Sequence, residues 1–331
     1  MPPPTSTTHA RADPQQSSNC SPDGGRVAEP VSKVGDTPRY GSEVRVLVTN
    51  DDGVHAPGLA SLARALRDSG CDVIVAAPAT EASGAGAGVG PLHTMGDGIE
   101  VTPVPLPGLE DTETLAVEAL PGLIVIAGCL GAYGPPPDLV VAGINPGRNV
   151  GRAVLHSGTV GAALTAVHFN KCGLAVSIQS GPFAYFESAA GSSDGGSLLH
   201  FDTAAAIAAV LAPMVASAPP RTVVNLNVPN LHLSQLRGIR WAKLARSGIV
   251  RSALVDASGG ARMQLELGFG DVQPGDESDE ALTSSGWATL TPLASVAEET
   301  RPEVRAVVAD ALEATGAALG LATEPEQEAA G

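Results

Sequence analysis

The pattern that most constrains the fold of this chain is a strand, a helix and a second strand in succession. A β-branched apolar run at 44–49 ends in the turn-forming segment 50–53, Asn-Asp-Asp-Gly, and a second apolar run occupies 72–77. Between them, Pro57 precedes an amphipathic helix that is expected over 58–68. One face of that helix carries four apolar side chains, Leu59, Leu62, Ala63 and Leu66. This order predicts parallel strand pairing with a right-handed crossover.

The same alternation continues along the chain. Three further buried strands are expected from short apolar runs at 138–143, 174–178 and 222–228. A loop is expected at 144–149, and helices are expected after residue 157 and over 203–217, the latter with Asp202 as its N-cap. We therefore predict an α/β protein with a Rossmann-like parallel sheet in three layers.

Composition divides the chain into four parts. Residues 1–43 are rich in Pro, Ser, Thr and Gly without any period, and we expect them to be disordered. Residues 44–237 form the predicted α/β core. Short strands and polar turns at 238–300 predict a β-rich extension that completes the same domain. Residues 301–331 are expected to form a C-terminal helix, over 302–319, and a tail.

The charge balance excludes one class of partner. The chain has 19 Lys and Arg residues against 35 Asp and Glu residues, a formal net charge of −16. Nucleic-acid polymers are bound by surfaces that neutralise several phosphates with Lys or Arg, so we expect no such partner. The four cysteines form no CxxC pair, and the sequence has neither an apolar leader nor a run of about 20 apolar residues. We expect a soluble cytoplasmic protein with no membrane partner.

Three polar loops, at 49–53, 78–84 and 143–149, come where predicted parallel strands end. Ligands of open α/β sheets bind at that edge. The adjacent carboxylates of Asp51 and Asp52 repel each other unless a cation is bound, and Mg²⁺ and Mn²⁺ prefer oxygen ligands. A turn with a helix cap is the alternative explanation of this pair, and the two residues by themselves do not decide between them.

The neighbouring loops offer further oxygen ligands and an anion site. Ser83 and Asn145 place a hydroxyl and an amide at the ends of neighbouring strands, although either residue alone is an ordinary loop residue. Ser157, Gly158 and Thr159 precede a predicted helix, whose free N–H groups form a phosphate cradle together with the two hydroxyls. Ordinary N-capping uses the same residue types and is the alternative.

Several stretches of the chain resemble, in order, the signatures of the SurE family, also called survival protein E, whose members are 5′/3′-nucleotidases. The resemblance is carried by residues 46–58 (VLVTNDDGVHAPG), 137–151 (PDLVVAGINPGRNVG), 156–163 (HSGTVGAA), 225–229 (NLNVP) and 287–293 (WATLTPL). These stretches span about residues 44–295. Several matches in the same order are not expected by chance.

The resemblance implies a SurE-type fold and a metal-dependent phosphomonoesterase that hydrolyses nucleoside monophosphates or a related small phosphate ester. It places one divalent ion per subunit, Mg²⁺ or Mn²⁺, on four ligands, Asp51, Asp52, Ser83 and Asn145. Asp51 and Asp52 are then the catalytic residues of a metal-assisted hydrolysis. The phosphate is bound by a second group, Asn149, Ser157, Gly158 and Thr159. The family also implies a homodimer or homotetramer assembled through the extension at 238–300.

Two loops depart from the family pattern. The family has Pro-Asp-Arg-Asn-x-Ser-Gly where this chain has PATEASG at 78–84, and its Gly-Thr-Pro-x-Asp-Cys stretch is replaced by ALPGLI at 119–124. Both loops are expected near the substrate pocket, which favours a phosphate ester other than the usual nucleotides. The alternative from another functional class is a non-catalytic regulatory or assembly protein that retains the metal site.

Two points stay open at the level of the residues. The nucleophile is either water or an Asp side chain. Asp279, in the segment SDEAL at 278–282, is a turn residue, a subunit contact or a pocket residue.

Overall fold

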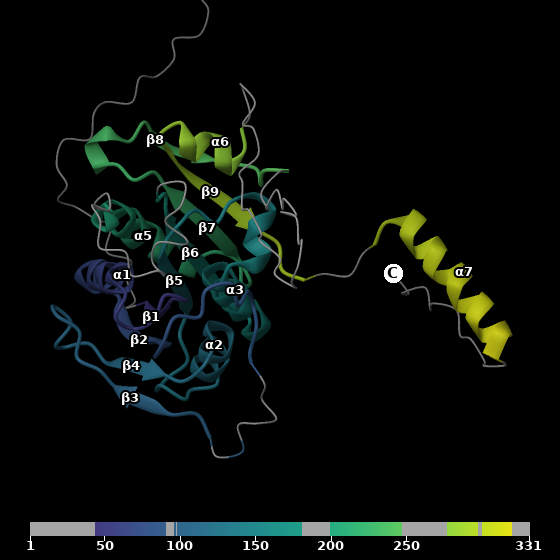
Figure 1. Cartoon of the computed structure of the whole chain (residues 1–331), viewed down its shortest axis with the longest axis horizontal. Helices are drawn as coiled ribbons and strands as arrows, with labels where there is room; N and C mark the ends of the chain where they lie inside the picture. The colour runs from purple at the N-terminus through teal and green to yellow at the C-terminus, as the bar shows by residue number, and fades with distance from the viewer. Residues whose placement is uncertain are drawn as a thin grey trace, which may run out of the picture. The chain divides into compact units, whose positions relative to one another are not determined.

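The computed structural model describes residues 44–90, 96, 98–180, 199–246, 277–296 and 300–319. The predicted disordered segment at 1–43, the part of the extension between 247 and 276, and the tail after 319 lie outside the described residues. The described part is α/β, as the sequence predicts. It contains a nine-stranded sheet with helices on both faces (Figure 1).

Most neighbouring strands of this sheet run parallel. Their order is β3-β4-β2-β1-β5-β6-β7-β9-β8, and within the described sheet only the β3–β4 and β7–β9 pairs are antiparallel. The strands are β1 Arg45–Thr49, β2 Asp72–Pro78, β3 Val101–Pro103, β4 Thr114–Val117, β5 Leu139–Pro146, β6 Cys172–Ile178, β7 Val223–Val228, β8 Gly238–Trp241 and β9 Trp287–Leu293. The expected β-α-β unit is therefore present, with β1 and β2 paired in parallel.

The central strands are apolar because they are buried on both faces. Every residue of β6 is buried, as is every residue of β5 except Pro146. Continuous runs of Val, Leu, Ile and Ala are typical of parallel strands that helices cover on both sides. Such uninterrupted apolar runs are bounded by polar turns, and the sequence therefore predicts these strands.

Two pairs of helices complete the three layers (Figure 1). The helix α1 (Pro57–Asp68) and the helix α5 (Phe201–Ala216) cover one face, and their buried side chains form one apolar cluster with β1, β5 and β6. The helix α2 (Pro121–Cys129) and the helix α3 (Gly158–Thr165) cover the other face. The other helices within the described residues are η2 Gly151–His156, η3 Ala166–Phe169, η4 Leu233–Gln235, α6 Asp279–Ser284 and α7 Pro302–Leu319.

The α/β core differs from the sequence-based expectations at one helix, one helix cap and one strand end. Helix α2 is not predicted, because its sequence PGLIVIAGC is apolar on all sides and has no helical period. Asp202 is not the N-cap of α5: His200 occupies that position and Asp202 lies in the first turn. Strand β5 continues through Pro146 into the expected loop, because Asn145 and Pro146 pair with β6 after an irregularity in the ladder.

The described part of region 238–300 extends the sheet. Strand β9 pairs with β7 and strand β8 pairs with β9, so these late strands form one edge of the sheet. Helix α6, which the sequence pattern does not predict, immediately precedes β9. None of the helices within the described ranges has the length and apolar composition that a membrane span requires.

Leu174 provides a test of this core. Its side chain is fully buried on β6, so Leu174→Ala should lower the free energy of unfolding by about 2–5 kcal/mol through lost burial and the cavity left behind. Leu130→Ala is the matched control, because Leu130 is 71% exposed at the end of α2 and its truncation should change stability by about 0.5 kcal/mol or less. Denaturant unfolding measures both, and equal losses would contradict the packing described here.

Candidate functional site

The candidate site lies where the chain changes direction across the sheet. From β1 the chain proceeds through β2 to β4 on one side, and from β5 through β6 to β7 on the other. Ligands bind outside the carboxyl ends of strands at such a switch point. Strand β1 ends at this position with Thr49, directly beside β5, and Asn50, Asp51 and Asp52 follow it.

Asp51 is buried against the start of α3. Only 4% of its surface is exposed, and its Oδ1 accepts a hydrogen bond of 2.5 Å from the hydroxyl of Thr159. A Cβ atom at position 158 would lie 2.7 Å from the Asp51 Cβ, so only glycine at that position allows this approach. The structure therefore brings together Asp51, Gly158 and Thr159, and it directs the Thr159 hydroxyl to the carboxylate.

The two carboxylates have unusual protonation behaviour in the metal-free protein. Burial raises the pKa of Asp52 to about 8, and the negative charges of Asp51 and Glu81 add to the effect. Burial also raises the pKa of Asp51, against the opposing hydrogen bonds from Thr159 and from nearby backbone N–H groups. A buried pair of like charges with no nearby cation favours the protonated form.

The surroundings of Asp52 suit a cation. Its Oδ2 atom is buried and has no protein hydrogen-bond partner. None of the ion pairs found between described residues involves Asp51 or Asp52. A hard divalent cation would neutralise both carboxylates and satisfy this oxygen, so the donor set fits the metal expected from the sequence.

The loop after β2 packs against the carboxylate segment. The Val54 N–H donates to the Pro78 carbonyl at 2.8 Å, and the Ala82 N–H donates to the Asp51 carbonyl at 2.7 Å. Ser83 follows directly and is exposed, and its hydroxyl donates to the Glu81 Oε1 at 2.8 Å. The structure thus places Ser83 next to the segment that carries Asp51.

Asn145 approaches the site from β5. It is 5% exposed, and its Nδ2 donates to the Gly147 carbonyl at 2.7 Å. Because the amide nitrogen is used in this way, the carbonyl oxygen of Asn145 is the atom suited to a cation. No three His, Cys, Asp or Glu side chains gather as a metal site in the described ranges.

The proposed phosphate cradle forms the start of α3. Ser157 is the N-cap, and its Oγ accepts a hydrogen bond of 3.1 Å from the Val160 N–H. The capping interaction predicted as the alternative is therefore present. It occupies a lone pair of the hydroxyl and leaves its proton available to an anion. The N-terminus of this helix also favours negative charge, from a carboxylate or a phosphate.

Asn149 is held by a polar network that the sequence analysis did not identify. Its Nδ2 donates to the Ser177 hydroxyl at 2.9 Å, and it is 8% exposed. Its backbone N–H donates to Asn227 Oδ1 at 2.9 Å, and its carbonyl accepts from Asn225 and Asn227 at 2.8 and 2.9 Å. The sequence did contain a signal for this network, the pattern Asn-Leu-Asn at 225–227, which places two amides on one face of a buried strand.

Asp279 is a buried hydrogen-bond acceptor at the first residue of α6 and is not a turn residue. None of its surface is exposed, and its carboxylate accepts hydrogen bonds from the N–H groups of Gly151, Ala245 and Glu280. Burial raises its pKa, and these three hydrogen bonds oppose that effect. It therefore contacts the chain just after Asn149, although the two residues are far apart in sequence.

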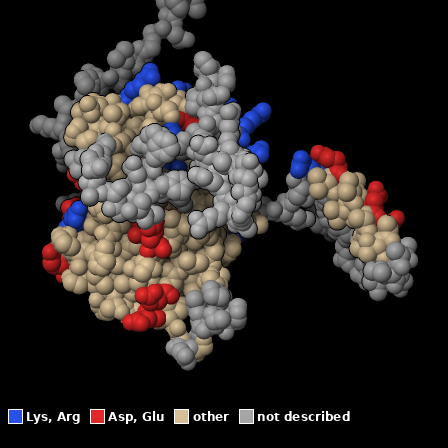
Figure 2. Space-filling model, in the orientation of Figure 1, with Lys and Arg blue, Asp and Glu red and all other residues tan. Residues whose placement is uncertain are grey.

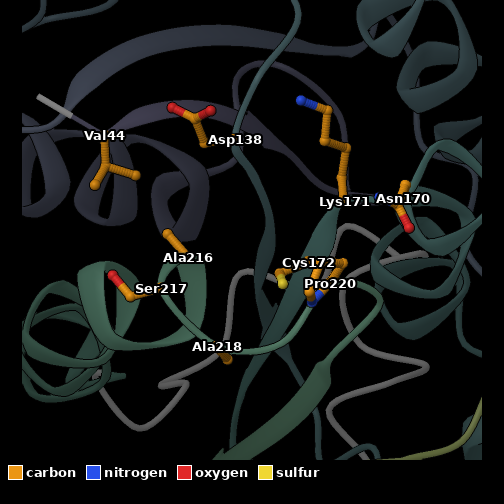
Figure 3. Close-up of a pocket in the computed structure, with 9 residues that line it drawn as sticks. All are labelled: Val44, Asp138, Asn170, Lys171, Cys172, Ala216, Ser217, Ala218 and Pro220. Carbon is orange, nitrogen blue, oxygen red and sulfur yellow. The ribbon is translucent and has the colours of Figure 1, made fainter. Parts of the chain in front are cut away.

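A cavity of about 340 Å³ lies at the other end of the strands (Figure 3). It is lined by residues at the amino ends of β1, β5 and β6, such as Val44, Asp138 and Cys172, and by the end of α5. Asp51 and Asp52 lie at the carboxyl end of β1, so this cavity is separate from the candidate site. In the view of Figure 2, the described Lys and Arg side chains are scattered and form no continuous stripe.

A family model described as survival protein SurE matches residues 46–250 of the chain. The chain is 35% identical over 254 residues to a protein from Aeromonas hydrophila named 5′-nucleotidase SurE, covering 76% of this chain and 92% of that protein. It is 32% identical over 277 residues to one from Shigella dysenteriae named 5′/3′-nucleotidase SurE, covering 82% and 98%.

The fold also resembles a solved structure. The crystal structure of the SurE protein from Aquifex aeolicus aligns with a TM-score of 0.62 and 22% sequence identity. The alignment covers 81% of this chain and 99% of that protein. This likeness supports the three-layer α/β fold described above.

The raised pKa of Asp52 predicts how stability depends on pH without metal. The Asp52 carboxyl has a pKa of about 8 in the folded protein, whereas an ordinary Asp carboxyl has a pKa of 3.8. Between these values the folded state binds more protons, so this group lowers stability as pH rises, by up to about 1.4 kcal/mol per pH unit. The gain in stability from Asp52→Asn should therefore increase from pH 5 to pH 8.

Denaturant unfolding in EDTA at several pH values measures this gain. Asp202→Asn is the control, since Asp202 is exposed in the first turn of α5. A gain from Asp52→Asn that is the same at pH 5 and pH 8 would contradict the electrostatic explanation.

Proposed function

The chain belongs to the SurE family, and on this basis we propose that it is a divalent-metal-dependent phosphatase that hydrolyses nucleoside monophosphates. The observation that carries the proposal is the pair of carboxylates at the switch point of the sheet. Asp51 is buried, and the half-buried Asp52 has one buried carboxylate oxygen that lacks a protein partner. The names of the nucleotidase relatives support the substrate class.

Four side chains are proposed to hold the cation, Asp51, Asp52, Ser83 and Asn145. Carboxylate, hydroxyl and amide oxygens suit Mg²⁺ or Mn²⁺ better than softer metals. When bound, such an ion polarises a phosphoryl oxygen and lowers the pKa of bound water. The Thr159 hydroxyl orients Asp51 through its hydrogen bond to Oδ1, which fixes one carboxylate relative to the start of α3.

The phosphate is proposed to bind at the start of α3 and along the preceding loop. The Ser157 hydroxyl is proposed to donate to a phosphoryl oxygen, and Asn149 is proposed to close the site from the β5 side. The N–H groups of Gly158 and Thr159 donate to the Asp51 carboxylate, and that of Val160 donates to Ser157 Oγ. Donors fixed in position before the reaction stabilise charge that develops in the transition state. The N-cap interaction of Ser157 with Val160 provides that fixed position.

Substrate preference is proposed to depend on the two loops that depart from the family. The stretch 119–124 begins helix α2, and a Cβ at Gly122 would lie 2.7 Å from the Gly88 carbonyl. A Cβ at Gly161 in α3 would lie 2.3 Å from the Gly86 carbonyl. Residues 86–88 therefore pack between α2 and α3, beside the proposed phosphate site. A related small phosphate ester is accordingly the second substrate class to test.

The first experiment is phosphate release from nucleoside monophosphates and sugar phosphates with Mn²⁺, Mg²⁺ or EDTA. We expect metal-dependent release that Asp51→Asn and Asp52→Asn each lower by at least about 100-fold, because each removes charge that holds the cation. Asp202→Asn should retain full activity as an exposed control. The best ester in the panel decides between nucleotides and another phosphate ester.

Absence of release from every ester, in a folded protein that binds Mn²⁺, would contradict the proposal within this panel. It would favour the non-catalytic regulatory or assembly role that shares the same metal site.

We also propose a homodimer or homotetramer that assembles through the edge formed by β8. Ile239 and Trp241 on this edge strand are 50% and 70% exposed, and exposed edge strands pair readily with other chains. Trp241→Glu should therefore lower the mass measured by light scattering after size-exclusion chromatography. Leu130→Glu is the control at a distant exposed position, and an unchanged mass for Trp241→Glu would contradict this interface.

A further inference from the structure

We propose that Asn225, Asn227 and Asp279 are positioning residues that hold the substrate-side loop at 149–151 in its active geometry. The inference rests on the proposed function, because it concerns the loop that carries Asn149. None of the three residues is exposed. They come from β7 and α6, far from the loop in sequence.

The loop needs such support because it lacks regular structure. Strand β5 ends at Pro146 and the short helix η2 begins at Gly151, so residues 147–150 lie in neither a strand nor a helix. Asn149 and Val150 are nevertheless buried. Buried backbone N–H and C=O groups require partners, and here side chains supply them.

The two asparagines bind the backbone of Asn149 on both of its polar groups. Asn227 accepts a hydrogen bond from the Asn149 N–H with Oδ1 and donates to the Asn149 carbonyl with Nδ2, both at 2.9 Å. Asn225 donates a second hydrogen bond to the same carbonyl at 2.8 Å. An amide can accept and donate at once, so Asn227 fixes the peptide groups on both sides of Asn149 in one orientation.

Asp279 binds the loop two residues further along. Its Oδ2 accepts from the Gly151 N–H, and its Oδ1 accepts from the N–H groups of Ala245 and Glu280, each at 2.9 Å. All of these neighbours are donors, so an ionised carboxylate is the matching side chain. An asparagine at this position would place its own N–H₂ group against at least one backbone N–H.

Arg148 ties the same loop to α6 by an independent contact. Its guanidinium donates to the Ser284 hydroxyl, and the negative charges of Glu280 and Asp279 act on it. Helix α6 thus holds the loop at a side chain before Asn149 and at a backbone group after it.

These contacts support the proposed substrate side of the site and not its proposed metal side. Asn225, Asn227 and Asp279 contact the backbone of residues 149 and 151, and these hydrogen bonds do not involve Asp51 or Asp52. Displacing the loop should therefore weaken productive substrate binding without changing metal affinity. A purely structural role would lower stability alone.

The test compares Asp279→Asn and Asn227→Ala with the wild-type full chain. We expect kcat/KM for adenosine monophosphate with Mn²⁺ to fall about 10–100-fold, since misplacing a substrate contact by about 1 Å costs on the order of 100-fold. The Mn²⁺ dissociation constant, measured by electron paramagnetic resonance, should stay within about twofold, because no metal ligand is changed.

Asp138→Asn is the matched control. Asp138 also accepts a backbone N–H, that of Arg45 at 3.0 Å, but at the amino end of the strands. Its kcat/KM should stay within about twofold of wild type even if its melting temperature falls.

Amide hydrogen exchange adds a readout that is independent of activity. The Gly151 and Ala245 amides should exchange faster in Asp279→Asn than in the wild type, while the amides of β1 keep their protection. If Asp279→Asn does not fold, Asn227→Ala and the Asn149 amide serve the same purpose.

Two results would overturn the inference. One is unchanged kcat/KM in folded variants, and the other is a loss of Mn²⁺ affinity equal to the loss of kcat/KM. Failure of the proposed function can be distinguished from failure of this inference, because the wild-type protein would then release no phosphate. In that case, exchange at Gly151 that matches the wild type in Asp279→Asn would still disprove the hold on the loop.

Discussion

The placement of two adjacent carboxylates, the buried Asp51 and the half-buried Asp52, is the constraint on which the rest of the site depends. Two like charges in a poorly solvated position are unfavourable unless a proton, a cation or hydrogen-bond donors compensate them. The protein supplies part of this compensation, through the Thr159 hydroxyl and the start of α3. Asp52 Oδ2 receives none from the described residues, and this imbalance is what makes the position suited to a divalent cation.

The parallel sheet makes this placement possible. Because β1 lies between β2 and β5 at the switch point, loops from both directions converge beyond its carboxyl end. Glycine at 158 lets α3 approach Asp51, so that a helix start, a carboxylate pair and the Ser83 loop come together. An apolar sheet covered on both faces provides the rigid support that such a site needs.

The late part of the chain completes the site from behind. Strand β7 and helix α6 contribute Asn225, Asn227 and Asp279, which satisfy the backbone of an irregular loop. In this arrangement the region after residue 222 does more than extend the sheet, because it supplies partners for buried polar groups near the substrate side. Polar side chains in a buried strand are costly without partners, and here their partner is the loop.

Local patterns in the sequence were sufficient for the β-α-β unit, the α/β class and the position of Asp51 and Asp52 at a strand end. Periodicity and turn chemistry act over a few residues, so one chain reveals them. They failed at α2, which has no period. Only the tertiary structure decided that Thr159 binds Asp51 across 108 residues and that Asp279 binds Gly151 across 128. Such partners are chosen by the packing of the whole sheet, which no local pattern records.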